Sequence, residues 1–272
     1  MLRRNAACIK VASGSRYLRS RAQSYLWILS ISACFLTWQL ISVLGLVPPD
    51  RFPSLQNAFF TLLVLGKSPS FLLLVLRSFL NIVLGVVLAL AVAIPTALLT
   101  SSRNRLDSAV TPLVMLVGAL PDLALLPLLV MWFGAGSLAA IMMAGLTAFF
   151  PIYFTIREGV RNIPKEFFQV ATVFGASRTD ILTKTVLPAI LPSTVTGVRL
   201  AFDFVWEIIL AIEMIASVSG VGFFISQRIT EDMGPAGINE AFAAVIAVGL
   251  IVILVDRGFF NLIERRFTRW RD

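Results

Sequence analysis

Long apolar stretches separated by short polar segments dominate the pattern of this chain. Six stretches stand out, at residues 26–47, 71–99, 110–133, 138–156, 192–218 and 241–263. A helix needs about 20 apolar residues to cross the hydrocarbon core of a bilayer, and a tilted helix needs more. The pattern therefore predicts an all-α integral membrane protein with about six transmembrane helices.

The second apolar stretch has a small or polar residue at every fourth position. These residues are Asn81, Gly85, Ala89, Ala93, Ala97 and Ser101. A ridge of small side chains lets another membrane helix approach closely, so we expect this face to pack against a helix. The pattern does not indicate whether that helix belongs to the same subunit or to a second one.

The third apolar stretch is interrupted by polar and helix-breaking residues. It contains Pro112, Pro121 and Pro127, with Asp122 between them. Proline removes a backbone donor and clashes with the preceding turn, so we expect a kinked or broken helix here. Broken membrane helices occur where the freed backbone lines a cavity or is covered by protein.

The longest polar interval, residues 162–197, reads as two helices joined at a glycine. Pro164 suits the first position of the first helix, and Gly175 is a good left-handed end for it. Ser177 and Asp180 have the spacing of a capping box, which predicts that a second helix begins there. We expect this second helix to end near Pro188, because a helix interior resists proline.

Composition and charge exclude several classes of protein. Hydrophobic residues make up 58% of the chain, charged residues make up 14%, and the mean hydropathy is +0.88. The chain has no histidine and only two distant cysteines, Cys8 and Cys34, which argues against common zinc sites and histidine-based catalysis. The net charge of +8 comes from basic residues that flank apolar stretches, so it indicates membrane topology and not nucleic-acid binding.

The distribution of Lys and Arg predicts the orientation. Basic residues gather at 3–21, 103–105, 157–184 and 257–271, whereas Arg51, Lys67 and Arg228 fall on the other side. By the positive-inside rule both termini and the polar interval are cytoplasmic. The first apolar stretch is too long for the hydrophobic region of a signal peptide, so we expect it to remain in the protein as a transmembrane helix. We expect a basic cytoplasmic tail at 1–24, one transmembrane domain at 25–265 with the polar interval at about 162–188, and a second basic tail at 266–272.

The polar interval resembles the EAA loop of ATP-binding-cassette (ABC) importer permeases, written E-A-A, three residues, G, nine residues, I, one residue, L-P. Ala171, Gly175, Leu187 and Pro188 match the motif, whereas Gln169, Val170 and Thr185 depart from it. The flanking segments 119–134 and 213–225 resemble the nitrate, sulfonate, taurine and bicarbonate group of these permeases. In that family the loop forms coupling helices that sit in a groove of a cytoplasmic ATPase. The residues to which this role is carried over are Glu166, Phe167, Gln169, Val170, Ala171, Phe174, Gly175, Ala176, Ser177, Leu187 and Pro188.

The resemblance implies a transport subunit and not an enzyme. Its expected partners are cytoplasmic ATPase subunits, an external solute-binding protein, a second permease copy and the lipid bilayer of the bacterial inner membrane. No cofactor or metal is expected on this chain, because ATP and Mg would bind the partner ATPase. The implied mechanism is alternating access, in which the coupling helices act as levers.

Carboxylates in the apolar stretches are candidates for the solute path or its gate. They are Asp122, Asp203, Glu207 and Glu213. Charges within a membrane are costly and usually face a cavity or a partner. For Asp203 the plain alternative is an ion pair with Arg199, four residues away, and for Glu213 it is a role in holding the outer turn.

The sequence leaves the solute and some functional alternatives open. The family subgroup suggests a small oxyanion or sulfonate, but acids in the path favour an amine-bearing or heterocyclic solute such as a vitamin precursor. An ion-coupled secondary transporter remains an alternative, and so does an intramembrane enzyme, for which no nucleophile or metal set is visible. The polar interval could also be an amphipathic helix lying on lipid, although its second half has no continuous apolar face.

Overall fold

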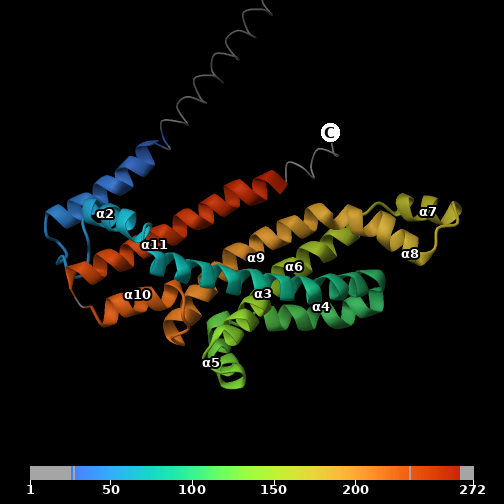
Figure 1. Ribbon diagram of the computed structural model, residues 1–272. Helices are drawn as coiled ribbons and strands as arrows, with labels where there is room; N and C mark the ends of the chain where they lie inside the picture. Colours follow the sequence, from blue (N-terminus) through green and yellow to red (C-terminus); the bar gives the residue numbers. More distant parts are fainter. Residues whose placement is uncertain (1–25, 27, 233, 264–272) are drawn as a thin grey trace, which may run out of the picture.

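The computed structural model describes residue 26, residues 28–232 and residues 234–263, and every regular element within them is helical (Figure 1). The two basic tails predicted at 1–24 and 266–272 lie outside the described residues. The elements run in the order helix Ile28–Val43, α2 (Leu55–Leu65), α3 (Pro69–Ser102), α4 (Asn104–Gly118), α5 (Asp122–Phe133), α6 (Ser137–Arg161), α7 (Lys165–Val173), α8 (Arg178–Asp180), the π-helix Ile181–Val186, α9 (Leu187–Ile215), α10 (Val221–Thr230), α11 (Pro235–Val255) and the π-helix Asp256–Phe260. The short helices α2 and α10 were not expected from the sequence.

Within the described residues, three helices are long and apolar enough to cross a membrane by themselves. They are α3, α6 and the run Pro235–Ile263 that begins with α11, and the bent pair of α4 and α5 passes the same test as a unit. Helix α9 is 29 residues long, but Arg199, Asp203, Glu207 and Glu213 make it less apolar. The helix Ile28–Val43 is apolar and shorter than a full span. Each of the six predicted stretches is therefore largely helical. Helix α9 fails the test for a membrane span because of its charges, and the helix Ile28–Val43 fails because of its length.

Helices α3, α6 and α9 pack together at the centre of the molecule. The small-residue ridge of α3 is buried, with Ala93 and Ala97 fully inaccessible. A Cβ atom added at Gly85 would lie 2.3 Å from the Cβ of Ala144 on α6, so only glycine permits this approach. The ridge therefore packs against a helix of the same subunit, which the sequence alone did not decide.

The third apolar stretch is broken, as its prolines predicted. Helix α4 ends at Gly118, α5 begins at Asp122, and the two axes differ by 91°. In Figure 1, α4 runs alongside α3 while α5 turns away from it. The break places the N-terminus of α5 beside α6 and α9, where it contributes to a cavity described below.

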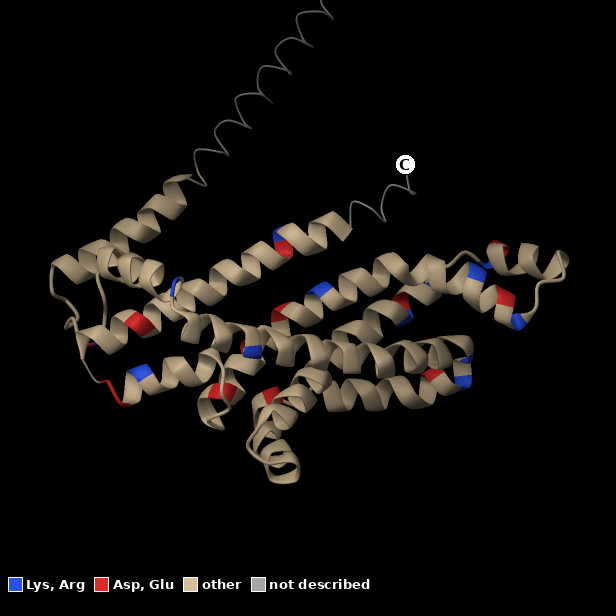
Figure 2. Ribbon diagram, in the orientation of Figure 1, with Lys and Arg blue, Asp and Glu red and all other residues tan. Residues whose placement is uncertain are grey.

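Charged residues gather at both ends of the molecule, including Arg228, Asp232 and Glu240 at the end formed by α10 and α11. Figure 2 shows Lys, Arg, Asp and Glu gathered around α7, α8 and the turn between α3 and α4. Helix α6 contains no charged residue from its start at Ser137 to Ile156. This is the arrangement expected when polar loops lie in water and the helices between them lie in hydrocarbon.

Candidate coupling site and translocation cavity

Helix α7 presents an apolar face that the rest of the subunit does not cover. Phe167 is 60% exposed, Val170 is 54% exposed and Phe174 is 85% exposed. Only Phe168 of this segment turns inward and packs against the core. The helix begins one residue later than predicted, because Pro164 occupies the N-cap position with an extended ψ of 136°. Glu166 lies in the first turn, where the helix dipole favours a negative charge.

The corner after α7 is a Schellman motif centred on Gly175. Its φ of +73° confirms the predicted left-handed conformation. The Gly175 N–H donates to the Thr172 carbonyl and the Ala176 N–H donates to the Ala171 carbonyl, both at 3.0 Å. These bonds satisfy carbonyls at the end of α7, so the corner has a defined geometry.

The predicted capping box at Ser177 is present. The Ser177 hydroxyl accepts from the Asp180 N–H at 3.1 Å, and the Asp180 carboxylate accepts from the Ser177 N–H at 3.2 Å. The Asp180 carboxylate also pairs with the Lys184 ammonium at 2.6 Å. Lys184, and after it the Ser177 donors, lower the pKa of Asp180 to about 2. The carboxylate therefore stays ionised near neutral pH and holds the start of α8.

The second helix does not end near Pro188, and that prediction was wrong. Residues 178–215 form one uninterrupted helical run, in which Ile181–Val186 is a π-helical turn. The Leu187 N–H donates to the carbonyl of Leu182, five residues earlier. This wider turn lies immediately before Pro188, where an α-helical ladder would clash with the proline ring. The corner at Gly175 is consequently connected to the core of the bundle through a single long helix.

The remaining residues predicted for coupling lie on α7, at the corner and at the start of α9. Gln169, Ser177 and Pro188 are exposed, and Ala171, Ala176 and Leu187 are half-buried. Phe167 also lines a small cavity of about 370 Å³ between the start of α7 and the π-helical turn. The structure thus places all of the predicted residues in one continuous segment.

An ion-pair cluster that the sequence analysis missed holds the base of this segment. Arg157 on α6 donates to both carboxylate oxygens of Asp107 on α4, at 2.6 and 2.7 Å. Arg161 and Thr111 add bonds to the same carboxylate, at 3.1 and 2.8 Å. The signal in the sequence was Asp107 itself, the single acid beside a basic turn at 103–105.

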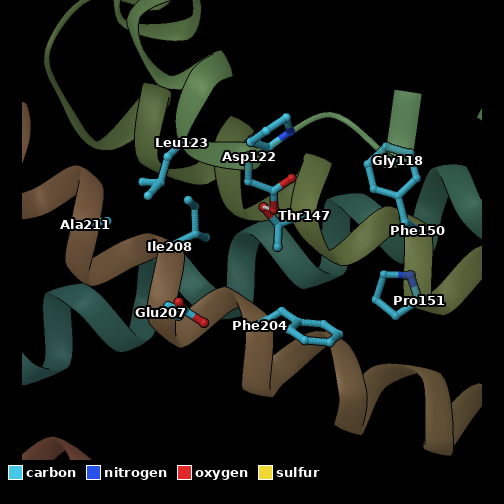
Figure 3. A pocket seen from close by; sticks show the side chains of 11 residues that line it. Gly118, Asp122, Leu123, Thr147, Phe150, Pro151, Phe204, Glu207, Ile208 and Ala211 are labelled. Atoms are coloured by element: carbon cyan, nitrogen blue, oxygen red, sulfur yellow. Dashed lines mark hydrogen bonds between the residues drawn. The ribbon is translucent and has the colours of Figure 1, made fainter. Parts of the chain in front are cut away.

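A cavity of about 470 Å³ lies between the start of α5, the middle of α6 and α9 (Figure 3). Its lining residues are Gly118, Pro121, Asp122, Leu123, Thr147, Phe150, Pro151, Phe204, Glu207, Ile208 and Ala211. Asp122 accepts a hydrogen bond of 2.7 Å from the Thr147 hydroxyl. Figure 3 shows Glu207 on the wall opposite Asp122. Two of the four predicted path carboxylates therefore share one cavity.

Asp203 and Glu213 lie elsewhere. The Arg199 guanidinium donates to both carboxylate oxygens of Asp256, on the neighbouring helix, at 2.6 and 2.9 Å. The alternative of an ion pair between Arg199 and Asp203 stays a prediction. Asp203 is exposed on α9 and does not line the cavity.

Glu213 is completely buried in a hydrogen-bond network at the turn between α9 and α10. One carboxylate oxygen accepts from the Ser78 hydroxyl and from the Gly222 N–H, both at 2.9 Å. The Ser78 hydroxyl in turn accepts from the Val221 N–H at 2.9 Å. In the same turn Ser217 has a φ of +52°, and Arg77 donates to Ser219 at 2.8 Å. The side chain thus ties α3, α9 and α10 together.

The fold and the site define a class of protein: a helical membrane subunit with a solute-sized cavity and a rigid polar corner outside the apolar helices. A family model described as "binding-protein-dependent transport system inner membrane component" matches residues 81–269. The chain belongs to this family of inner-membrane ABC importer permeases. Such subunits are multi-pass, have no ATPase activity of their own, and work with ATPase and solute-binding partners.

Curated relatives and solved structures agree with this assignment. The chain is 30% identical to a putative aliphatic sulfonates transport permease protein of Bacillus subtilis over 86% of this chain and 83% of the relative. It is 34% identical to a putative ABC transporter permease protein of Methanocaldococcus jannaschii over 70% of each chain, and 28% identical to the taurine transport system permease protein of Escherichia coli over 93% and 95%. Inward-facing structures of the MetNI methionine ABC transporter share the fold, with a TM-score of 0.62 at 17% identity over 74% of this chain and 99% of that chain.

Proposed function

We propose that this permease subunit forms the path for a small polar solute and that the corner of α7 and α8 couples the path to an ATPase. The observation that carries the proposal is the exposed apolar face of α7. Phe174 leaves 85% of its surface uncovered on an ordered corner next to charged loops. A contiguous exposed apolar face that includes aromatic side chains is typical of a protein–protein interface.

The long helix that begins at α8 supplies the mechanical link. It extends from the corner to Phe204 and Glu207 in the cavity, a distance of about 40 Å at 1.5 Å per residue. We infer that this continuous run moves as one unit, so movement of the corner alters the position of one cavity wall. ATP-dependent closure of the ATPase pair then exposes the cavity alternately to each side.

The proposal also covers the orientation of the chain in the membrane, its assembly with a second copy and the class of solute. Both termini and the corner are assigned to the cytoplasm on the basis of the basic residues. A second copy of the chain is proposed to complete the path, because the resemblance to ABC importer permeases implies a pair of permease subunits. The names of the relatives include sulfonate, taurine and bicarbonate, which supports a small polar solute and leaves the charged group of the solute undefined.

Site-specific photo-crosslinking tests the coupling role. Phe174 is replaced by the photoreactive analogue benzoylphenylalanine, and membranes that contain the whole transporter are illuminated. We expect a covalent product between this chain and its ATPase subunit. Phe59, which is 60% exposed on α2 near the opposite end, is the matched control and should give no such product. An ATPase product from Phe59 but none from Phe174 would overturn the assignment.

A further inference from the structure

The cavity between α5, α6 and α9 has an electrostatic character that specifies the solute further. We propose that it accepts solutes carrying a cationic nitrogen and that it disfavours solutes whose only charge is an oxyanion. This assignment rests on the transport function proposed above and concerns the same cavity. It replaces the simple oxyanion that the family subgroup suggested.

The charges that line the cavity all have one sign. Asp122 and Glu207 are its ionisable residues, and no Lys or Arg belongs to the lining among the described residues. Asp122 is bonded to the neutral hydroxyl of Thr147, and Glu207 has no hydrogen bond or ion pair within the described part of the chain. The guanidinium on the same helix, that of Arg199, is engaged by Asp256. The negative charge of the cavity is therefore not offset by a side chain in its wall.

The positive feature that could attract an anion lies beside a carboxylate. Helix α5 begins at the cavity, and the N-terminus of a helix can bind an oxyanion. Asp122 lies in the first turn of α5, so its negative charge opposes the binding of a second anion there. An added oxyanion would meet two carboxylates and no free cation in the lining.

The neutral part of the lining also suits a cation. Phe150 from α6 and Phe204 from α9 present aromatic rings to the cavity, as Figure 3 shows. Ammonium groups are attracted to the faces of aromatic rings, and the attraction increases when water is excluded. A volume of about 470 Å³ is within the range of sites for small organic molecules. An amine in the cavity would be attracted by the charges of Asp122 and Glu207 and by the aromatic rings of the same lining.

Two thiol reagents of similar size and opposite charge measure this preference without knowledge of the solute. Cys8 and Cys34 are replaced by alanine, and a reporter cysteine is placed in the cavity by Ala211→Cys or, in a second protein, by Leu123→Cys. The purified complex with its ATPase subunits is treated with trimethylammonioethyl methanethiosulfonate or sulfonatoethyl methanethiosulfonate. The thiolate forms a disulfide with either reagent and releases methanesulfinate. Ala135→Cys is the reference position, because Ala135 lies in an exposed turn and no charged residue occurs in sequence between Leu123 and Ile156. The ratio of its reaction rates with the cationic and the anionic reagent is the reference ratio.

We expect the cationic reagent to be favoured at both cavity positions by at least about tenfold relative to Ala135→Cys. A cation and an anion about 6 Å from one carboxylate differ by this factor even at the dielectric constant of bulk water. Glu207→Gln should reduce the preference severalfold, and Glu207→Gln with Asp122→Asn should abolish it. An equal or greater rate for the anionic reagent, or a preference unaffected by both substitutions, would overturn the proposal. Co-purification of the ATPase subunits with the cysteine-free parent is scored in the same experiment. Its failure would contradict the proposed transport function, whereas the ratio of labelling rates tests the solute class.

Discussion

The guanidinium of Arg157 and the carboxylate of Asp107 join the end of α6 to the start of α4 through two hydrogen bonds of 2.6 and 2.7 Å. Their side chains are 14% and 20% exposed, so the pair is largely shielded from water. Helix α6 leads within a few residues to α7. This pair therefore sets the position from which the coupling segment projects.

Removing the guanidinium group of Arg157, which donates two hydrogen bonds to Asp107, should lower the stability of the subunit. Arg157→Lys keeps the charge but cannot donate two parallel bonds to Asp107, and we expect a loss of about 1.5–3 kcal/mol in the free energy of unfolding. The measurement is the thermal unfolding midpoint of the purified complex in detergent. Lys184→Gln, which breaks an exposed pair with Asp180, is the control and should cost about 0–1 kcal/mol. Equal shifts in both variants would contradict the structural role of the Arg157 pair.

A single methyl group at the contact between α3 and α6 should disrupt packing. In Gly85→Ala the new Cβ would lie 2.3 Å from the Cβ of Ala144 and 2.9 Å from the backbone nitrogen of Gly145. We expect a loss of about 1–3 kcal/mol from overpacking and a reduced yield of the folded subunit. Gly249→Ala on α11 is the matched control, because its Cβ would meet nothing within 4 Å. The measurement is fluorescence-detected size-exclusion chromatography of both variants. A normal elution profile for Gly85→Ala would show that α3 and α6 are not in close contact at Gly85.

Loss of the Glu213 carboxylate should loosen the turn between α9 and α10. Glu213→Ala leaves the buried Gly222 N–H without its acceptor, at a cost of about 1–3 kcal/mol, whereas Glu213→Gln retains an acceptor oxygen. We expect faster hydrogen exchange at residues 217–225 in the alanine variant and a smaller change in the glutamine variant. Glu231→Ala, at the exposed end of α10, serves as the control. Unchanged exchange in Glu213→Ala would mean that the network does not hold the turn.

Local signals in the sequence predicted the features that depend on neighbouring residues. The positive φ of Gly175, the capping box at Ser177 and the break near Pro121 all follow from backbone chemistry within a few positions. The pairs Asp107 with Arg157 and Arg199 with Asp256 span 50 and 57 residues, so they depend on how the helices pack, and no local pattern indicated them. Pro188 was misread because a π-helical turn, which the sequence pattern does not reveal, accommodates it. The cavity shared by Asp122 and Glu207 likewise required the tertiary arrangement of α5 and α9.

If the corner couples the ATPase to the path, substitutions there should uncouple ATP hydrolysis from transport and leave the fold intact. Gly175→Val forces a β-branched residue into a left-handed conformation, which costs about 1–2 kcal/mol of conformational free energy. We expect the direction of α7 relative to α8 to change as a result. Phe174→Ala removes the exposed anchor and leaves the core intact. Both variants should reach the membrane in normal amounts. The controls are Gly136→Val, where the glycine has an extended φ of −171° and open space, and Lys67→Ala in the loop between α2 and α3.

The most direct measurement is the nucleotide-dependent reactivity of the cavity in these variants. A cysteine introduced by Ala211→Cys, in the background without native cysteines, is labelled in the reconstituted transporter with and without ATP and vanadate. The account predicts that trapping the ATPase changes the labelling rate severalfold in the parent, Gly136→Val and Lys67→Ala proteins. It predicts no change in Phe174→Ala and Gly175→Val, which are present in the membrane but uncoupled. A normal nucleotide-dependent change in both of these variants would contradict the claim that the corner of α7 and α8 couples ATP to transport.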